Sequence, residues 1–269
     1  MKIIRSKIKL KKLIKNEKNL GFVPTMGGIH KGHISLIRES IKKSEYTVVS
    51  IFVNKQQFNE ENDFKTYPRD LKQDIEKLKN LDIDVLYLPN HNDIYPNGYN
   101  KKIKINIFSK KLCGKNRPKH FEAVADVIER FIDILNPKNI FFGKKDMQQL
   151  LIVEDFIRKK YPFIKVVACN TIREKNGVAL SSRNFLLTKN DINTASKIVK
   201  LIKKNKVKLI QDKKFKNNLK KELYKFGVNK IDYIEPLDVN KIIKQFRKKR
   251  NFKIFFAYYL RRIRLIDNI

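Results

Sequence analysis

The segment 24–33, Pro-Thr-Met-Gly-Gly-Ile-His-Lys-Gly-His, combines glycines with two histidines in a pattern suited to phosphate chemistry. Glycine lets the backbone approach a phosphate closely, and a helix that begins directly afterwards presents free N–H groups and the positive end of its dipole. His30 and His33 are three residues apart and would lie on one side of the first helical turn. Alternatively, the two histidines are capping residues or form half of a metal site. The metal alternative is weak, because the chain has four histidines and this segment has no cysteine or carboxylate at ligand spacing.

A second polar segment, 52–58, offers amide groups rather than charges. Asn54 and Gln57 can each donate and accept hydrogen bonds, which suits the orientation of a small polar substrate. Taken alone, the segment reads more simply as a turn rich in Asn and Gln.

A third segment, 143–149, carries two adjacent lysines, Lys144 and Lys145, followed by Asp146 as a plausible helix N-cap. A lysine at the mouth of a site acts as a point charge for phosphate. Composition does not choose between the two lysines, and in so lysine-rich a chain either one can be an ordinary solvated side chain.

The fourth segment runs from Thr171 to Asn184 and contains two serines and an arginine in sequence, Ser181, Ser182 and Arg183. Two hydroxyls and a guanidinium can grip a polyphosphate. They can equally form a capped helix start.

Alternation between two-residue and 3.6-residue hydrophobic periodicity before residue 175 predicts an α/β unit with a parallel sheet. Strands are expected at 20–23, 46–52, 83–88, 140–142 and 165–169, and helices at 32–43, 70–80, 121–135 and 146–159. Each of the four polar segments follows a strand. Ligands of open parallel sheets bind beyond the carboxyl ends of the strands, so all four are expected to open onto one sheet edge.

Beyond residue 184 the pattern changes to lysine-rich helical segments over 191–226, followed by strand-like 230–235, 252–259 and 263–265. This predicts a smaller α+β domain. The expected domains are therefore 1–175 and 176–269, with the boundary based on the change of pattern alone.

The net charge of +34 suggests a nucleic-acid partner, but its composition and distribution argue against one. Lysines number 48 and arginines 13, whereas base and phosphate recognition favours arginine. Residues 1–185 and 186–269 each carry a net charge of +17, so no single stripe holds the excess. Compositional drift toward lysine is the preferred interpretation.

No apolar stretch approaches the roughly 18 residues of a membrane-spanning helix, and the N-terminal lysines interrupt any signal-peptide core. We therefore expect a cytoplasmic protein without a membrane partner. Cys113 and Cys169 lack the spacing of a zinc site or a disulfide framework and are expected to be core residues.

At these residues the chain resembles the pantothenate synthetase family, also called pantoate–β-alanine ligases. The resemblance runs in family order through PTMGGIHKGH, SIFVNKQQF, YPRD, LCGKNRPKHF, FFGKKDMQQL and TIREKNGVALSSRN, and resumes at IDYIEPLD and RLIDNI. It implies a Rossmann-like first domain, a homodimer, and ATP with Mg²⁺ as cofactors. The implied reaction condenses (R)-pantoate with β-alanine to give pantothenate, AMP and pyrophosphate through a pantoyl-adenylate.

The resemblance also implies roles for individual residues. His33 takes the place of a proton donor, and His30, Lys145 and Arg183 complete the expected catalytic set, with Lys145 now selected over Lys144 as the catalytic lysine. Gln57 and Gln149 match substrate ligands, and Asn54 is expected to join them. Nucleotide contacts are implied for Met26, Gly27, Gly28, Ile29, His30, Lys31, Gly32, His33, Gly143, Lys144, Lys145, Asp146, Ile172, Leu180, Ser181, Ser182 and Arg183. The Mg²⁺ ligands are not implied.

The chain departs from the family pattern at four positions near these motifs. Lys55 replaces a Pro, Lys119 a Gly, Lys144 a Glu and Ala123 a Gly. These departures bear on affinity, rate and stability rather than on the chemistry. Two other functions stay open: a different small-molecule nucleotidyltransferase of the same fold, which the uncharged Gln57 and Gln149 argue against, and a basic nucleic-acid-binding protein.

Overall fold

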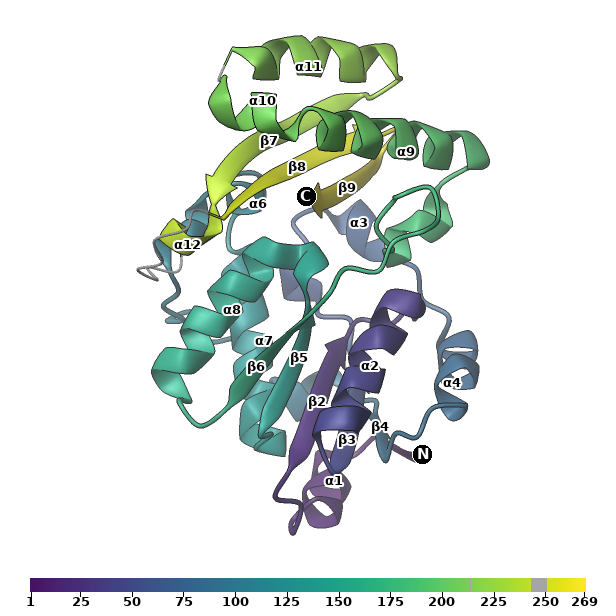
Figure 1. Cartoon of the computed structure of the whole chain (residues 1–269). Coiled ribbons are helices and arrows are strands. Elements are labelled where there is room, and N and C mark those ends of the chain that lie inside the picture. The colour runs from purple at the N-terminus through teal and green to yellow at the C-terminus, as the bar shows by residue number, and fades with distance from the viewer. Residues whose placement is uncertain (213, 243–250) are drawn as a thin grey trace.

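The computed structural model describes residues 1–212, 214–242 and 251–269. A six-stranded parallel sheet with helices on both faces forms its larger part, and a three-stranded antiparallel sheet with helices forms the smaller part, shown above it in Figure 1. The parallel strands are β1 (Lys2–Ile4), β2 (Leu20–Thr25), β3 (Tyr46–Ile51), β4 (Val85–Tyr87), β5 (Asn139–Gly143) and β6 (Lys165–Cys169). The antiparallel strands are β7 (Lys230–Asp238), β8 (Phe252–Leu260) and β9 (Ile263–Asn268). The predicted α/β fold with a smaller α+β part is confirmed.

The helices follow the strands in the order expected of an α/β fold. They are α1 (Lys7–Leu13), α2 (Lys31–Lys43), α3 (Glu61–Lys65), α4 (Leu71–Lys79), α5 (His91–Ile94), α6 (Cys113–Asn116), α7 (His120–Leu135), α8 (Met147–Lys160), α9 (Lys189–Lys204), α10 (Lys206–Gln211), α11 (Phe215–Lys225) and α12 (Val239–Ile242). Short 3₁₀ turns join some of them: η1 (Lys55–Gln57), η2 (Ile107–Lys110), η3 (Lys144–Asp146) and η4 (Ser182–Leu186).

The strand order of the parallel sheet, β1-β4-β3-β2-β5-β6, reverses its direction between β2 and β5. The chain moves from β2 toward one edge of the sheet and later returns to β5 on the other side of β2. Loops at such a switch point diverge and leave a crevice in which ligands bind. The glycine-rich segment leaves β2 here and the two-lysine segment leaves β5.

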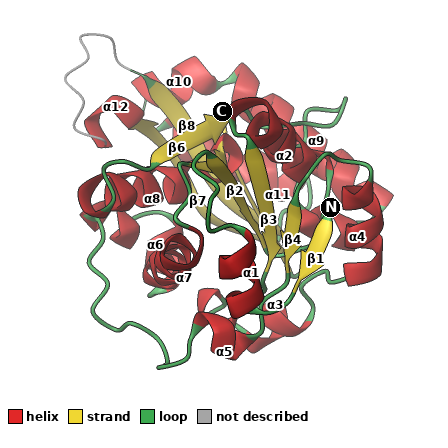
Figure 2. Ribbon diagram, turned by 90° about the horizontal axis from the view of Figure 1, so that it is seen from below, coloured by secondary structure: helices red, strands yellow, loops and turns green. Residues whose placement is uncertain are grey.

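Alternate residues of each parallel strand enter two different cores, because successive side chains point to opposite faces of a sheet. Phe22 and Ile140 pack on the face covered by α1, α7 and α8. Val23 and Phe141 pack on the opposite face with α2 and α4. Figure 2, which views the molecule from below, shows these helices on the two sides of the sheet.

The smaller part builds a third core from helices α9 to α11 and the antiparallel strands. Helix α9 begins with a capping box in which Thr188 and Asp191 satisfy each other's backbone N–H groups. Phe255 of β8 and Tyr233 of β7 enter the core of the parallel domain instead. The small sheet is therefore docked through apolar contacts.

The predicted strands and helices are found with ends that differ by a few residues. The helical stretch expected over 191–226 is divided into α9, α10 and α11, and it includes residue 213, which lies outside the described residues. The sequence analysis assigned no element before residue 20, where the structure has β1 and α1. Both are short, and the dispersed lysines obscure their periodicity. The boundary near residue 175 stays a prediction.

Candidate active site

A cavity of about 580 Å³ lies between the carboxyl ends of the parallel strands and the small sheet. All four polar segments contribute to its wall. The predicted site residues that line it are Met26, His30, Gly32, His33, Gln57, Gly143, Lys145, Asp146, Gln149, Ile172, Leu180, Ser181, Ser182 and Arg183. The expected meeting of distant segments in one pocket is therefore found, and the chemical role of each residue stays a prediction.

The two histidines of the glycine-rich segment lie against each other at the start of α2. His30 occupies the N-cap position, and its Nδ1 accepts a hydrogen bond from the Gly32 N–H at 3.0 Å. The rings of His30 and His33 stack with their centroids 4.0 Å apart. A Cβ at Gly32 would lie 2.7 Å from the His30 ring, so only glycine leaves room for this cap. The capping alternative thus holds for His30, whose Nε2 remains for a ligand.

Both imidazoles are neutral near pH 7. Burial and, to a smaller extent, the charge of Lys145 lower the pKa of His30 to about 4, against the opposing effect of Asp146. Burial, followed by the proximity of His30 and Lys145, holds the pKa of His33 well below its usual value. Nδ1 of His33 is buried without a hydrogen-bond partner in the described part of the chain. A bound polyanion would favour the protonated rings and raise both pKa values.

Asp74 of α4 holds the glycine-rich loop from beneath. Its carboxylate accepts the N–H groups of Gly28 and Ile29 at 2.9 and 2.6 Å, and its side chain is buried. Gly28 has a φ of +62°, a left-handed conformation that glycine adopts without steric cost. Asp74 was not predicted as a site residue from the sequence. The signal that could have identified it is a carboxylate on the apolar face of a predicted helix, one residue before Ile75.

The side chains of Ser182 and Ser181 both form hydrogen bonds within the protein. The Ser182 hydroxyl lies 3.1 Å from the Gly28 carbonyl oxygen and donates to it, which ties the fourth segment to the glycine-rich loop. Ser181 caps the turn η4 by accepting the Arg183 N–H at 3.3 Å. The capped-turn alternative therefore describes Ser181, while both side chains still line the cavity.

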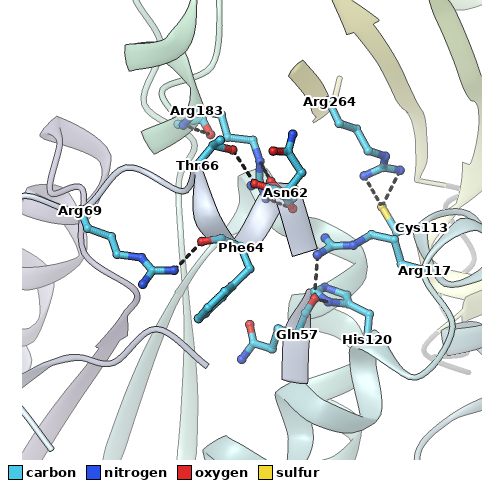
Figure 3. Close-up of polar contacts among 12 residues, drawn as sticks. Gln57, Asn62, Phe64, Thr66, Arg69, Cys113, Arg117, His120, Arg183 and Arg264 are labelled. Carbon is cyan, nitrogen blue, oxygen red and sulfur yellow. Dashed lines mark hydrogen bonds and ion pairs between the residues drawn. The ribbon is translucent and has the colours of Figure 1, made fainter. Parts of the chain in front are cut away.

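Arg183 forms a two-pronged ion pair with Asp63 of α3, at 2.8 and 2.9 Å (Figure 3). Its guanidinium also lies over the ring of Tyr67, 5.4 Å from the centroid. The pair connects two segments 120 residues apart and was not foreseen from the sequence. Asp63 would compete with a bound phosphate for the Nε and Nη2 donors of Arg183.

Gln57 is fixed through its backbone and leaves its side chain to the cavity. The Gln57 carbonyl oxygen accepts hydrogen bonds from the Arg117 guanidinium and from Nδ1 of His120, each at 2.8 Å (Figure 3). Burial and the adjacent Arg117 hold the pKa of His120 well below its usual value. The LCGKNRPKHF motif thus positions Gln57.

Two departures from the family pattern adjoin this region. Lys119 precedes α7 with a φ of +62°, so a lysine adopts the left-handed conformation at the position where the family pattern has glycine. Such a conformation costs a side-chain-bearing residue about 1 kcal/mol or more. The Ala123 carbonyl accepts the Asn54 amide at 3.3 Å.

Lys145 lines the cavity and Lys144 does not. The Lys145 ammonium lies 3.2 Å from the Asp146 carboxylate, and the backbone carbonyls of both lysines accept hydrogen bonds from the Asn268 amide at 2.8 Å. Asp146 stands at the N-cap position of α8, but its side chain makes no capping hydrogen bond there. The C-terminal strand thus orients the segment that carries Lys145.

Six predicted ligands do not line this cavity, and their roles as ligands stay predictions. Gly27, Gly28 and Ile29 are buried beneath it, where their backbone is held by hydrogen bonds. Lys31 is exposed on α2, and Lys144 turns to the Asn170 side chain at 2.8 Å. Asn54 is buried against α7 because its amide donates to a helix carbonyl.

The described residues contain no group of three or more His, Cys, Asp or Glu side chains arranged to hold a metal ion. Two carboxylates of the cavity wall, Asp63 and Asp146, are each already near a cation. A metal that depends mainly on protein ligands does not fit this wall. In the described part of the chain no helix is long and apolar enough to cross a membrane.

The family model for pantoate-β-alanine ligase matches residues 2–269. The chain belongs to the pantoate–β-alanine ligase family. Among curated proteins, the pantothenate synthetase of Francisella tularensis subsp. novicida (strain U112) is 38% identical over 257 residues, which covers 95% of this chain and 90% of the relative. The reaction of the family is the ATP-dependent ligation of pantoate to β-alanine by an AMP-forming ligase.

Solved structures of the ligase family have the same fold. The Francisella tularensis pantoate-β-alanine ligase complexed with β,γ-ATP and β-alanine is 35% identical, with a TM-score of 0.85 over 100% of this chain and 97% of that one. The pantothenate synthetase of Thermus thermophilus is 28% identical, with a TM-score of 0.87 over 100% of this chain and 99% of that one. Both cover the cavity wall as well as the sheet.

Proposed function

We propose that the chain joins pantoate to β-alanine in the 580 Å³ cavity, first by forming pantoyl-adenylate and then by aminolysis of that intermediate. One observation carries this proposal: His33, Gln57, Lys145 and Arg183 come from the segments that follow four different strands, and they line the same cavity. Cationic and amide groups are thus brought together where a triphosphate and a small acid can lie side by side.

In the first step, the carboxylate of pantoate attacks the α-phosphorus of ATP, and pyrophosphate leaves. Two anions have to approach, so the site must stabilise charge on the phosphoryl oxygens and on the leaving group. Lys145 is suited to this task because its ammonium is largely buried, with 18% of the side chain exposed. Arg183 is the second donor, after it releases Asp63.

His33 acts in this proposal as a neutral hydrogen-bond donor. Its pKa is held well below its usual value, so the imidazole is neutral at pH 7. A neutral N–H can still stabilise charge that develops on a phosphate oxygen. His30, whose Nδ1 is occupied by its cap, is left with Nε2 for the same purpose.

The remaining walls position the nucleotide and the organic acid. Gly143, Asp146, Ile172, Leu180, Ser181 and Ser182 surround the nucleotide in this proposal, together with Met26 and Gly32. Gln57 and Gln149 hold pantoate through their amides. The neutral amine of β-alanine then attacks the acyl carbon, and proximity supplies most of the rate gain. No covalent enzyme nucleophile is required.

Mg²⁺ fits this site only as an ion held mainly by the phosphates of ATP. Such an ion commonly takes one or two carboxylates and several waters from its surroundings. Asp63 or Asp146 can supply a carboxylate, since both line the cavity. When bound, the ion would neutralise phosphate charge.

The same proposal covers the domain boundary, the oligomeric state and the cellular location of the protein. We assign residues 1–175 to the nucleotide-binding domain and 176–269 to a domain that covers the site. The family resemblance supports a homodimer, which analytical ultracentrifugation would test. The buried free thiols of Cys113 and Cys169 suit the reducing cytoplasm, where ATP is also available.

The proposed function is tested by AMP release from the purified protein. Release must require both pantoate and β-alanine. Pantoate-dependent exchange of pyrophosphate into ATP isolates the first step, and Lys145→Ala should reduce this exchange about 10²-fold through loss of one preorganised donor. Lys144→Ala removes the same charge from the neighbouring residue outside the cavity and should change exchange at most a few-fold. Equal losses in the two variants would refute the assignment of Lys145.

A further inference from the structure

A second cavity, of about 470 Å³, lies beside the first. Its wall combines the turn after β5, the hairpin that follows β6, one side of α9, and parts of β8 and β9. Asn170, Thr171, Val199 and Asn268 line both cavities, so the two are separated only by a shared wall. None of the expected catalytic residues lines this second cavity.

The second cavity is strongly cationic. Its ionisable side chains are Lys144, Arg173, Lys175, Lys200, Lys203 and Lys253. Arg173 is neutralised by a two-pronged ion pair with Asp267 at 2.6 and 2.9 Å. The five lysines have no carboxylate within ion-pair distance among the described residues, and no lining residue is an Asp or Glu.

Lysine abundance alone does not account for this wall. Five of the thirteen lining residues are lysines, against 48 of 269 in the whole chain. They come from four separate segments, which only the folded chain brings together. Lys144 also stands where the family pattern has glutamate, so at this one position a negative charge is replaced by a positive one.

The lysines repel one another in the absence of an anion. Lys253 on β8 is half-buried, and its pKa is lowered first by burial and then by the charges of Lys206, Arg173 and Lys144. Asp267 opposes this shift but is already paired with Arg173, so the lysines still repel one another and destabilise the arrangement that holds them. A bound anion would relieve both the repulsion and the loss of hydration.

We propose that the second cavity is a binding site for a small phosphate-bearing anion, distinct from the nucleotide site. Lysine is a common phosphate ligand as a point charge, and a volume of about 470 Å³ suits a small ligand with its waters. The anion comes either from solution or from the reaction itself. The second source rests on the proposed function, because adenylation releases pyrophosphate next to the shared wall.

Pyrophosphate binding to the full chain tests the site without turnover. Isothermal titration of inorganic pyrophosphate, at low ionic strength and without pantoate, should resolve two sites per chain: the phosphate region of the first cavity and the second cavity. In Lys200→Gln/Lys203→Gln one of the two should weaken about tenfold, because two exposed charges of the second cavity are lost. Added salt should weaken it further.

A matched control lies on the same helix. Lys197→Gln/Lys204→Gln removes the same charge from α9, at exposed positions outside the second cavity, and should keep both sites. One site in the wild type, or equal weakening in the two double variants, overturns the proposal. The ligase assay does not enter this result, so failure of the proposed function and failure of this site are distinguishable.

Competition between anions identifies whether the bound anion comes from solution or from the reaction. Preference for pyrophosphate over a phosphomonoester such as glycerol phosphate supports the site with the reaction product as its ligand. The opposite preference supports the site with a phosphorylated solute as its ligand. Binding of neither anion at the lysine-dependent site overturns the proposal.

Discussion

The two walls of the active-site cavity are held in place by different parts of the molecule. The glycine-rich wall depends on Asp74, which belongs to the same parallel domain and accepts two loop N–H groups. The wall over 170–184 depends on the last strand, where Arg173 pairs with Asp267. One wall is therefore held within the parallel-sheet part alone, while the other is held from both parts: Ser182 contacts the glycine-rich loop, and Arg173 pairs with Asp267 of the small sheet.

This difference predicts which part of the protein is destabilised when each carboxylate is lost. The carboxylate of Asp74 is buried inside one domain, so its loss should unsettle the loop and the adjacent sheet edge. Asp267 joins two parts of the chain, and Asn268 next to it holds the carbonyls of Lys144 and Lys145. Loss of this link should loosen docking, and with it the position of Lys145.

The largest effect is expected from Asp74→Asn. An amide can accept one of the two loop N–H groups but presents its own N–H₂ to the other, which leaves a buried donor without an acceptor. We expect a loss of about 3 kcal/mol in the free energy of unfolding, measured by urea denaturation. ATP binding should weaken in parallel, because the loop that it requires is no longer fixed.

Asp70→Asn is the control for this variant. Asp70 caps the same helix by accepting the Gln73 N–H at 2.9 Å, and asparagine caps about equally well. Its stability should stay within about 0.5 kcal/mol of the wild type. Equal losses in the two variants would contradict the role given to the buried carboxylate.

Asp267→Asn should have the next largest effect. Asp267 is buried and Arg173 is 28% exposed, so the uncompensated guanidinium gains partial hydration, and the loss should be about 2 kcal/mol. Limited proteolysis should also release the small domain faster, because docking is weakened. The control Glu235→Gln removes an ion pair of Lys216 that lies within the small domain. Faster release in both variants would mean that docking does not depend on Asp267.

The strands and the polar segments that follow them could be predicted because their signals are local. Hydrophobic periodicity marks β2 and β5, and the motifs lie directly after them in the sequence. The partners of those motifs could not be predicted. Asp74 is 46 residues from Gly28, and Asp63 is 120 residues from Arg183. Choosing these carboxylates among the other acidic residues requires the packing of α3 and α4 against the sheet edge.

Asn54 also has a partner that the sequence does not indicate. Its position in a motif after β3 predicts a substrate ligand, and in the structure its amide donates to the Ala123 carbonyl of α7 at 3.3 Å. Composition alone left Lys144 and Lys145 equivalent and only the family resemblance selected Lys145, whereas the structure directs one toward each cavity. Side-chain direction follows from tertiary neighbours that spacing does not contain.

The histidines of the glycine-rich wall predict acid sensitivity. The folded protein holds the pKa of His30 near 4, against 6.5 for an ordinary histidine, so the unfolded chain binds the proton first as the pH falls. Stability should therefore fall as the pH drops below about 6.5, by about 1 kcal/mol from His30 between pH 7 and 5.5. Urea denaturation at these two pH values measures this change in the free energy of unfolding.

His30→Asn should remove this part of the pH dependence while keeping a helix cap. Its unfolding free energy should change less between the two pH values than that of the wild type. The same slope in both proteins would show that burial of His30 does not control the acid response.

The smallest expected effect concerns Asp63, which in the proposed site competes with the phosphates of ATP for Arg183. A partly exposed ion pair contributes about 1 kcal/mol or less, so its removal in Asp63→Asn should tighten ATP binding about two- to fivefold. Glu61→Gln is the control, because it removes the same charge from α3 without releasing Arg183; Glu61 pairs with the exposed Lys65. Isothermal titration at low ionic strength compares the three proteins. Tightening in both variants would assign the effect to the net charge of α3, whereas weaker binding in Asp63→Asn alone would mean that Asp63 orients the arginine for its ligand.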